Sequence, residues 1–327
     1  MKTRFFALLC LLSPTLLASP TGPPHYGDRY AEVVERILDA WKSADVVCLG
    51  EDHGRKYDSD LRLSLVRHPA LPTVVRVIVV EFANPVHQEM IDRFILDGTP
   101  MSREDLSVVW RDASGAEVWE SSIYEDFLRA VQKINSALPR DRRIRVIGGD
   151  SPIDWKVIKT PEQLVPLVNR GGNIRAIIAR LLDSNVKVLA IYGAGHCDKI
   201  GGGFPGDLAG KYAATRMWSI EPVFRSTGSA KAKTLFGLGD RPAYVVIAGT
   251  NWAKMPAEEL TIAPPGVALG EVLDAVIYHG DVEDEVVKAD LTQLNAKYAA
   301  ELARRQSLIE GALTLLRQGR GRPVGGS

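Results

Sequence analysis

The chain has 327 residues, of which 46% are hydrophobic and 24% are charged. Forty Lys and Arg residues balance forty Asp and Glu residues, so the formal net charge is zero. This composition is typical of a folded protein and predicts one large domain, or one domain with an insertion. The charge balance excludes the broad basic surface of a nucleic-acid-binding protein.

The first twenty residues predict a secretory signal rather than part of the fold. Lys2 and Arg4 supply positive charge, an apolar run extends from Phe5 to Leu17, and the small residues Ala18-Ser19 follow. The run is too short for a membrane span of ~20 residues. We therefore expect an exported product, periplasmic or secreted, without stable membrane insertion after cleavage. The alternative is an uncleaved membrane anchor.

Two cysteines, Cys48 and Cys197, remain after the signal. Two are too few for a disulfide scaffold. An exported protein could still pair them. The simpler expectation is two small buried residues, with Cys48 beneath the candidate site described below.

Helical and strand patterns alternate through the first part of the mature chain. Apolar residues at helical spacing predict a helix from about Arg29, and a strand follows at Val46–Leu49. A second helical pattern covers Asp58–His68. The run Val74–Val80 is rich in β-branched residues, which suits a central parallel strand, and Val86–Leu96 is an amphipathic helix.

Residues 101–121 interrupt this alternation. Trp110 and Trp119 flank an Ala-Ser-Gly turn. The stretch is interpreted either as a lid over the sheet or as a structural loop held by its tryptophans. A helix at Ile123–Leu138 and a third strand at Ile144–Ile147 then resume the pattern.

The second half predicts further alternating elements. A helical stretch at Pro161–Leu182, with a break near Gly171-Gly172, precedes a fourth strand at Val186–Tyr192 and a flexible loop at Gly201–Gly206. Later elements are expected as strands at Trp218–Pro222, Tyr244–Ala248 and Ala275–Tyr278, a long helix or helix pair at Val286–Leu316, and a disordered tail at 319–327.

This alternation predicts an α/β fold for residues 21–318, with a mostly parallel central sheet and helices on both faces. In open sheets of this kind, ligands bind beyond the carboxyl ends of the strands. The first four predicted strands all end in acid or base groups, listed in chain order: Glu51 with His53, then Glu81, Asp150 and His196. Because parallel strands share one carboxyl edge, we expect these groups to converge there in a functional site.

Several well-known chemistries lack their motifs here. The chain has no G-x-S-x-G elbow, no H-E-x-x-H and no C-x-x-C. The phosphate-loop pattern fails at Gly210-Lys211, because Tyr212 stands where Ser or Thr belongs and Pro205 replaces the first glycine. A typical serine hydrolase and a nucleotide-binding loop are therefore disfavoured.

Two mechanisms fit the remaining groups. In the first, His53 is a general base for water, Glu51 or Glu81 fixes its tautomer, and His196 donates to the oxyanion or leaving group. No cofactor is then needed. In the second, the same four side chains hold a divalent metal. The residues leave both open.

Three further side chains are candidates for binding a small-molecule substrate. Arg55 or Arg111 could neutralise a substrate anion, and Asp150 ends the third strand. His25, His68 and His279 are expected in loops or at the surface. We expect His87, at a helix start, to cap the helix or face solvent.

The strand-exit motifs resemble the erythromycin esterase-like and ChaN-like superfamily, which includes the Tiki and TraB proteins. The resemblance is carried by four segments: Leu49-Gly50-Glu51-Asp52-His53-Gly54, Val80-Glu81-Phe82, the helix QEMIDRFILDG from Gln88 to Gly98, and Gly193-Ala194-Gly195-His196. It implies an α/β fold with its site at these strand ends.

The branches of this superfamily imply different functions. The esterase branch implies metal-independent hydrolysis with His53 as base and with Glu51, Glu81 and His196 in the site. Its usual Glu–His spacing is three, whereas the spacing here is two, as in ChaN-like haem-binding proteins. The Tiki-like branch implies a metal-dependent peptidase with a Gly-x-x-His motif.

The leading hypothesis is an exported hydrolase of an ester, lactone or amide. The alternatives are a haem-binding uptake protein, which needs an axial His, Tyr or Cys, and a metal-dependent peptidase. Candidate haem ligands are Tyr57, His53, His87 and His196.

Overall fold

The computed structural model describes residues 28–168, 170–213, 216–223, 229–289 and 294–320. The predicted signal segment and the tail from residue 321 lie outside these residues. Of the helices in the described part of the chain, none combines the length and apolar character needed to span a lipid bilayer.

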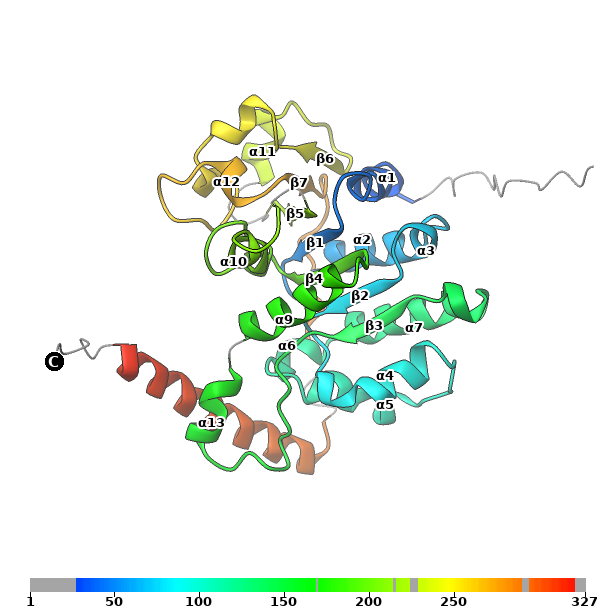
Figure 1. Cartoon of the computed structure of the whole chain (residues 1–327), viewed down its shortest axis with the longest axis vertical. Helices are drawn as coiled ribbons and strands as arrows, with labels where there is room; N and C mark the ends of the chain where they lie inside the picture. Colours follow the sequence, from blue (N-terminus) through cyan, green and yellow to red (C-terminus); the bar gives the residue numbers. More distant parts are fainter. Residues whose placement is uncertain (1–27, 169, 214–215, 224–228, 290–293, 321–327) are drawn as a thin grey trace, which may run out of the picture.

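Seven strands form one sheet in the order β3-β2-β4-β1-β5-β7-β6 (Figure 1). The strands are β1 Val46–Glu51, β2 Val77–Val80, β3 Arg145–Gly148, β4 Val188–Gly193, β5 Met217–Pro222, β6 Ala243–Val246 and β7 Ala275–Tyr278. All neighbouring pairs are parallel except β6 with β7. The predicted α/β fold with a mostly parallel sheet is confirmed.

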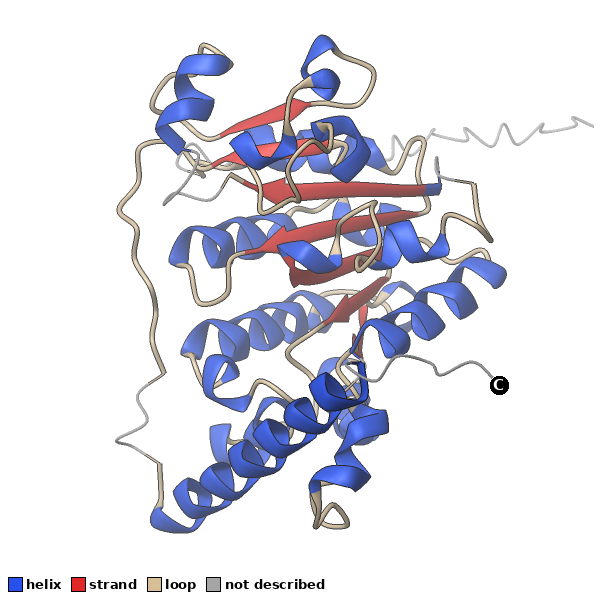
Figure 2. Ribbon diagram, turned by 90° about the vertical axis from the view of Figure 1, so that its left-hand side faces the viewer, coloured by secondary structure: helices blue, strands red, loops and turns tan. Residues whose placement is uncertain are grey.

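Helices cover both faces of the sheet (Figure 2). They are α1 Ala31–Ala40, α2 Lys56–Arg67, α3 Leu71–Val74, α4 Gln88–Ile95, α5 Arg103–Arg111, α6 Ala116–Trp119, α7 Ser122–Ser136, α8 Pro161–Leu164, α9 Arg170–Asp183, α10 Phe204–Leu208, α11 Ser229–Leu235, α12 Leu269–Val272 and α13 Ala296–Arg320. Short 3₁₀ turns connect several of them, including η4 at Ala194–His196.

The central position of β1 explains its apolar sequence. β1 pairs with β4 on one side and β5 on the other, and all six of its residues are buried. Val47 and Leu49 join the core cluster that includes α1, α2 and α7, whereas Val46 and Cys48 join the cluster that includes α9 and α10. Successive side chains thus enter two different cores.

Some predicted element boundaries were wrong. Residues 71–74 form helix α3, whose first turn tolerates Pro72 because the missing amide would have no helical partner there, so β2 begins only at Val77. The two glycines at 171–172 lie inside α9, and the predicted loop at 201–206 runs into α10. The last helix begins at Ala296, ten residues later than predicted.

The stretch 101–121 is mostly helical rather than a loop. Ser102 caps α5 by accepting a hydrogen bond from the Asp105 amide, and α6 follows after a short turn. Trp110 and Trp119 are both 1% exposed. Burial of the two indole rings therefore anchors this segment to the core.

Residues 281–289, which follow β7, run along the outside of the molecule (Figure 2). Within them, the Val287 amide donates to the Gly54 carbonyl at 2.8 Å, and the Lys56 amide donates to the Glu285 carbonyl at 3.0 Å. These hydrogen bonds attach the segment to the loop that carries His53.

Candidate active site

The exits of β1, β2 and β4 meet because these strands are neighbours in the order β2-β4-β1. His53 Nδ1 lies 2.8 Å from Glu51 Oε1, and His53 Nε2 lies 3.7 Å from Glu81 Oε2. On the other side of Glu81, His196 Nε2 lies 3.3 Å from Oε1. The four side chains thus form one continuous row, Glu51–His53–Glu81–His196.

Glu51 is buried among groups that compensate its charge. Its Oε2 pairs with the guanidinium of Arg62, and Tyr124 Oη donates to its Oε1 at 3.3 Å. Tyr124 Oη also accepts a hydrogen bond from the Gly54 amide at 3.1 Å. Burial lowers the pKa of Arg62 to about 10, with the Tyr124 oxygen opposing the shift, so this guanidinium is still charged at neutral pH.

The charge of Glu81 depends on both imidazoles. Burial alone would raise the pKa of this carboxyl. The hydrogen bond and charge of His196, the charge of His53 and the Gly193 amide outweigh burial and lower the pKa to about 2. The Gly193 amide donates to Glu81 Oε2 at 2.7 Å. Glu81 is therefore an anion placed between two bases.

Gly193 also makes room for His53. A Cβ atom at this position would lie 2.8 Å from His53 Nε2 and 3.5 Å from Glu81 Oε2. The backbone angles of Gly193, φ −53° and ψ 140°, are open to any residue. The glycine is thus required for the space that the imidazole ring occupies, not for its backbone conformation.

The loop that carries His53 is fixed from two further directions. The rings of Trp119 in α6 and His53 pack in a T-shaped arrangement, with centroids 4.5 Å apart. The Asp52 amide donates to Asp58 Oδ2 at 2.9 Å. Both contacts orient the short loop between Glu51 and α2.

His279 lies in the loop after β7, as one of its two predicted positions allowed, but it is not at the surface. His279 is 4% exposed, its Nε2 lies 3.0 Å from Asp58 Oδ1 and its Nδ1 lies 2.9 Å from Tyr30 Oη. It follows β7, so the strand exit at β7 reaches back to Asp58. A buried Tyr30–His279–Asp58 chain therefore supports the loop of His53 from behind.

The predicted substrate-binding residues lie in contacts of their own. Arg55 bonds Asp52 and Asp284, each at 2.9 Å. Arg111 bonds Glu120 at 2.7 Å and Glu104 at 3.0 Å, and these partners outweigh burial to raise its pKa. Their binding role stays a prediction.

Asp150, the third of these residues, is 1% exposed and accepts a hydrogen bond from Ser114 Oγ at 2.8 Å. The contact ties the β3 exit to the turn between α5 and α6. Asp150 lies outside the row of four side chains.

The cysteines form a disulfide between Cys48 in β1 and Cys197 after η4. The expectation of two unpaired buried residues was therefore wrong, although both side chains are buried. The return of the chain through η4 brings Cys197 beside β1, which the linear sequence did not reveal.

Two of the candidate haem ligands, Tyr57 and His87, lie in contacts outside the row of four side chains. Tyr57 is 4% exposed and its ring packs on His279, and His87 bonds Asp112 at 2.7 Å rather than capping α4. Among the described residues, no group of three or more His, Cys, Asp or Glu side chains is arranged to hold a metal ion.

Sequence reasoning missed Arg62, Tyr124 and an acidic residue, Glu221, near the end of the fifth strand. Arg62 lies one turn after Asp58 on the buried face of α2, and Tyr124 begins the apolar face of α7. A charged residue within an apolar helical face is a signal that could have identified Arg62. At the exit of β5, burial raises the pKa of Glu221 well above its ordinary value, as does its bond to Asp198.

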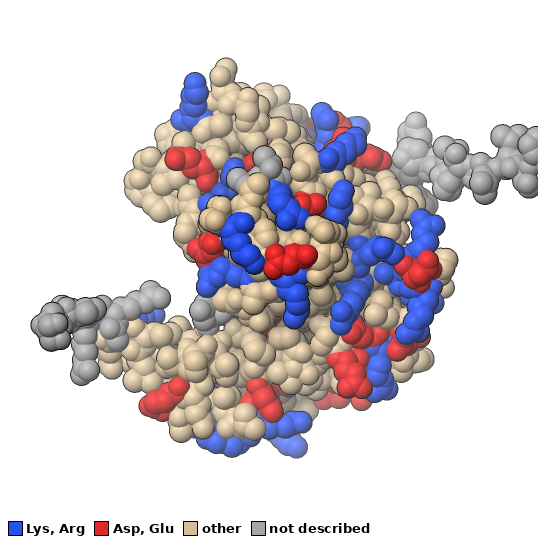
Figure 3. Space-filling model, viewed as in Figure 1, with Lys and Arg blue, Asp and Glu red and all other residues tan. Residues whose placement is uncertain are grey.

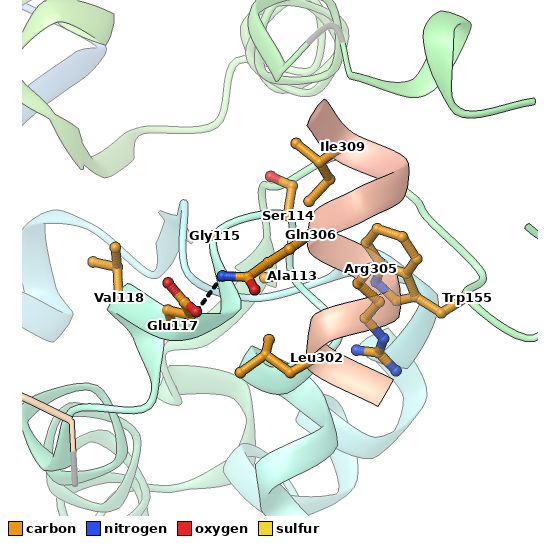
Figure 4. A pocket seen from close by; sticks show the side chains of 10 residues that line it. All are labelled: Ala113, Ser114, Gly115, Glu117, Val118, Trp155, Leu302, Arg305, Gln306 and Ile309. Atoms are coloured by element: carbon orange, nitrogen blue, oxygen red, sulfur yellow. Dashed lines mark hydrogen bonds between the residues drawn. The ribbon is translucent and has the colours of Figure 1, made fainter. Parts of the chain in front are cut away.

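A cavity of about 140 Å³ lies between the turn after α5, α6 and α13 (Figure 4). Val118, Trp155, Leu302 and Ile309 supply its apolar lining, and Gln306 hydrogen-bonds Glu117 across one side. Val118 in this lining is adjacent in sequence to Trp119, which contacts His53.

On the surface shown in Figure 3, basic and acidic side chains are interspersed, in keeping with the zero net charge.

No protein-family model matches the chain, and no curated protein matches its sequence. Its structure is similar to that of a Bacillus cereus protein, with TM-score 0.54, 13% identity, and coverage of 78% of this chain and 93% of that chain. It is also similar to a mutant of the erythromycin esterase EreC in its open conformation, with TM-score 0.50, 11% identity, and coverage of 77% and 95%.

A haem-bound ChaN of Campylobacter jejuni gives TM-score 0.39 at 14% identity, with coverage of 59% and 86%. The similarity to EreC and to the Bacillus cereus protein shows the fold alone. At the level of the fold, the predicted resemblance to an erythromycin esterase is confirmed.

Proposed function

We propose that this chain, which has the fold of the erythromycin esterase-like and ChaN-like proteins, is an exported hydrolase of an ester, lactone or amide. The observation that carries the proposal is the row Glu51–His53–Glu81–His196, in which each neighbour lies within 3.7 Å of the next. Two bases that share one buried anion are more than the sheet edge needs in order to fold. They suit acid–base chemistry on a bound carbonyl compound.

His53 acts as the general base. Its Nδ1–H donates to Glu51, so Nε2, the nitrogen on the Glu81 side, takes the proton of an attacking water. The water oxygen bonds to the substrate carbonyl carbon as the proton moves to Nε2. Glu51 and Glu81 stabilise the imidazolium, as a carboxylate does in other His-dependent hydrolases.

His196 assists the second half of the reaction. It donates to the developing oxyanion or to the leaving group, and Glu81 holds its ring through Nε2. Its side chain is 27% exposed and that of His53 is 30% exposed, whereas both glutamates are nearly buried. The bases thus remain accessible while the carboxylates that orient them are shielded.

The test is hydrolysis of a panel of aryl esters, lactones and amides by the wild type and by His53→Ala. We expect the variant to lose turnover by about 10²- to 10⁴-fold while its circular dichroism is unchanged. His68→Ala is the matched control, because His68 pairs with Glu35 far from the row. Full activity in His53→Ala would contradict the proposal.

The same preparation distinguishes the alternatives. The haem-binding hypothesis requires a shifted Soret band on addition of haemin, and the metal-dependent peptidase requires stoichiometric metal by elemental analysis. We expect hydrolysis to persist in chelator-treated protein, because the four side chains contact one another in a row. Loss of turnover on chelation, restored by a divalent metal, would favour the peptidase.

A further inference from the structure

The Cys48–Cys197 disulfide is placed directly behind His196. It joins two residues 149 positions apart, and the side chains are 1% and 0% exposed. Cys48 is level with Ala190 of β4 in the sheet register. β4 runs on for three residues, or ~10 Å, and η4 then returns the chain so that Cys197 meets Cys48.

The turn that carries His196 has few other anchors. The Cys197 amide donates to the Ala194 carbonyl within the turn. After the turn, the Asp198 side chain hydrogen-bonds Glu221 of β5, and the Lys199 amide donates to the Val272 carbonyl at 2.7 Å. In the described part of the chain, no backbone hydrogen bond joins residues 194–197 to another element. The position of the turn therefore depends on side chains.

The side chains of the consecutive residues His196 and Cys197 point in different directions. Cys197 enters the core between β1 and α9, whereas His196 contacts Glu81 at 3.3 Å and the edge of Tyr192 at a centroid distance of 5.8 Å. The disulfide fixes the residue next to His196, with the Cα atoms of the two cysteines 5.5 Å apart. It therefore limits how far the imidazole can move from Glu81.

We propose that the Cys48–Cys197 disulfide is a positioning element that holds His196 against Glu81, so that loss of the bond impairs the site without unfolding the sheet. The inference rests on the proposed function for its effect on turnover. The effect of the disulfide on the His196–Glu81 contact can be measured whether or not the protein hydrolyses a substrate.

A mutant cycle on activity tests the first effect. We expect Cys48→Ala/Cys197→Ala to lower kcat/KM by about 10²-fold, as a misplaced catalytic group does. If the disulfide acts through His196, the triple variant with His196→Asn is no worse than His196→Asn alone, within about 3-fold. If the triple variant instead combines the losses of kcat/KM from the cysteine variant and from His196→Asn, the proposal is overturned. Full activity in the cysteine variant would overturn it as well.

Titration of Glu81 by NMR, with ¹³C-labelled glutamate, tests the second effect. Glu81 in the wild type should titrate at about 2, largely because of His196. In the cysteine variant its pKa should rise toward 4.5; an unchanged value would overturn the proposal. If the pKa rises in a protein that hydrolyses nothing, the positioning role stands and the proposed function fails.

Leu182→Ala is the matched control, because Leu182 is 1% exposed in the same core cluster and the variant keeps the disulfide. It should lower the melting temperature without changing the titration of Glu81. Should the alanine pair fail to fold, dithiothreitol reduction of the wild type gives the same comparison. Two electrons and two protons pass from dithiothreitol to the protein, the S–S bond breaks, two thiols form and the reagent closes to a cyclic disulfide.

Discussion

The two histidines of the site are held in different ways. His53 lies two residues after Glu51, and that pair is enclosed by Arg62, Tyr124 and Trp119. His196 comes from a short turn after β4, meets a glutamate from another strand, and is followed by a disulfide-bonded cysteine. One base is thus fixed by a buried polar network, and the other by a covalent link. Four predictions separate these two supports.

Removing Arg62 should have the largest effect, because it leaves Glu51 buried without its cation. We expect Arg62→Met to lower the free energy of unfolding by about 3–5 kcal/mol. Urea unfolding followed by tryptophan fluorescence measures the loss. The control is Glu51→Gln/Arg62→Met, which should regain most of the stability but not the activity. Wild-type stability in Arg62→Met would show that the network does not support His53.

The second prediction concerns the dependence of stability on pH at Glu81. Its pKa in the folded protein, about 2, lies below the ordinary value of 4.5. The resulting stabilisation of about 3 kcal/mol is therefore complete above pH ~4.5 and is lost as the pH falls toward 2. Glu81→Gln should unfold more easily than the wild type at pH 6, and the two should converge near pH 2. A constant difference across this range would contradict the role assigned to the two imidazoles.

Gly193 lies where the two halves of the site meet. Gly193→Ala should displace the His53 ring and lower kcat/KM by about 10²-fold, because a Cβ would lie 2.8 Å from Nε2. Gly195→Ala is the control, since a Cβ there would meet nothing within 4 Å. Initial-rate assays of both variants measure the difference in kcat/KM. Equal activities would mean that the ring has space to move.

The smallest effect is expected at Arg55. Its ion pairs with Asp52 and Asp284 are partly exposed, so Arg55→Gln should change the free energy of unfolding by less than about 1 kcal/mol. KM should stay within about 3-fold, because the guanidinium already has two carboxylate partners. A much larger rise in KM with unchanged kcat would instead support the predicted binding of a substrate anion by Arg55.

The row of four could be anticipated because its members follow apolar strand-like segments. Val46–Leu49 and Val188–Tyr192 are apolar on both faces, which predicts buried parallel strands, and parallel strands end at one edge. Arg62 stands out as a charged residue on the buried face of α2, but the sequence does not identify its partner, and Tyr124 is one of several buried residues of α7. Their partner Glu51 is reached only when α2 and α7 pack on the same face of the sheet.

The sequence by itself determined the α/β alternation and the identity of the acid and base groups, since local periodicity and strand exits are properties of neighbouring residues. Only the tertiary structure decided that β4 lies between β1 and β2, and hence that Glu81 reaches both His53 and His196. It also decided the Cys48–Cys197 bond and the burial of His279. These contacts join residues that are distant in sequence. They are therefore set by the order of the strands and by the turns that bring the chain back to the sheet, not by any local sequence pattern.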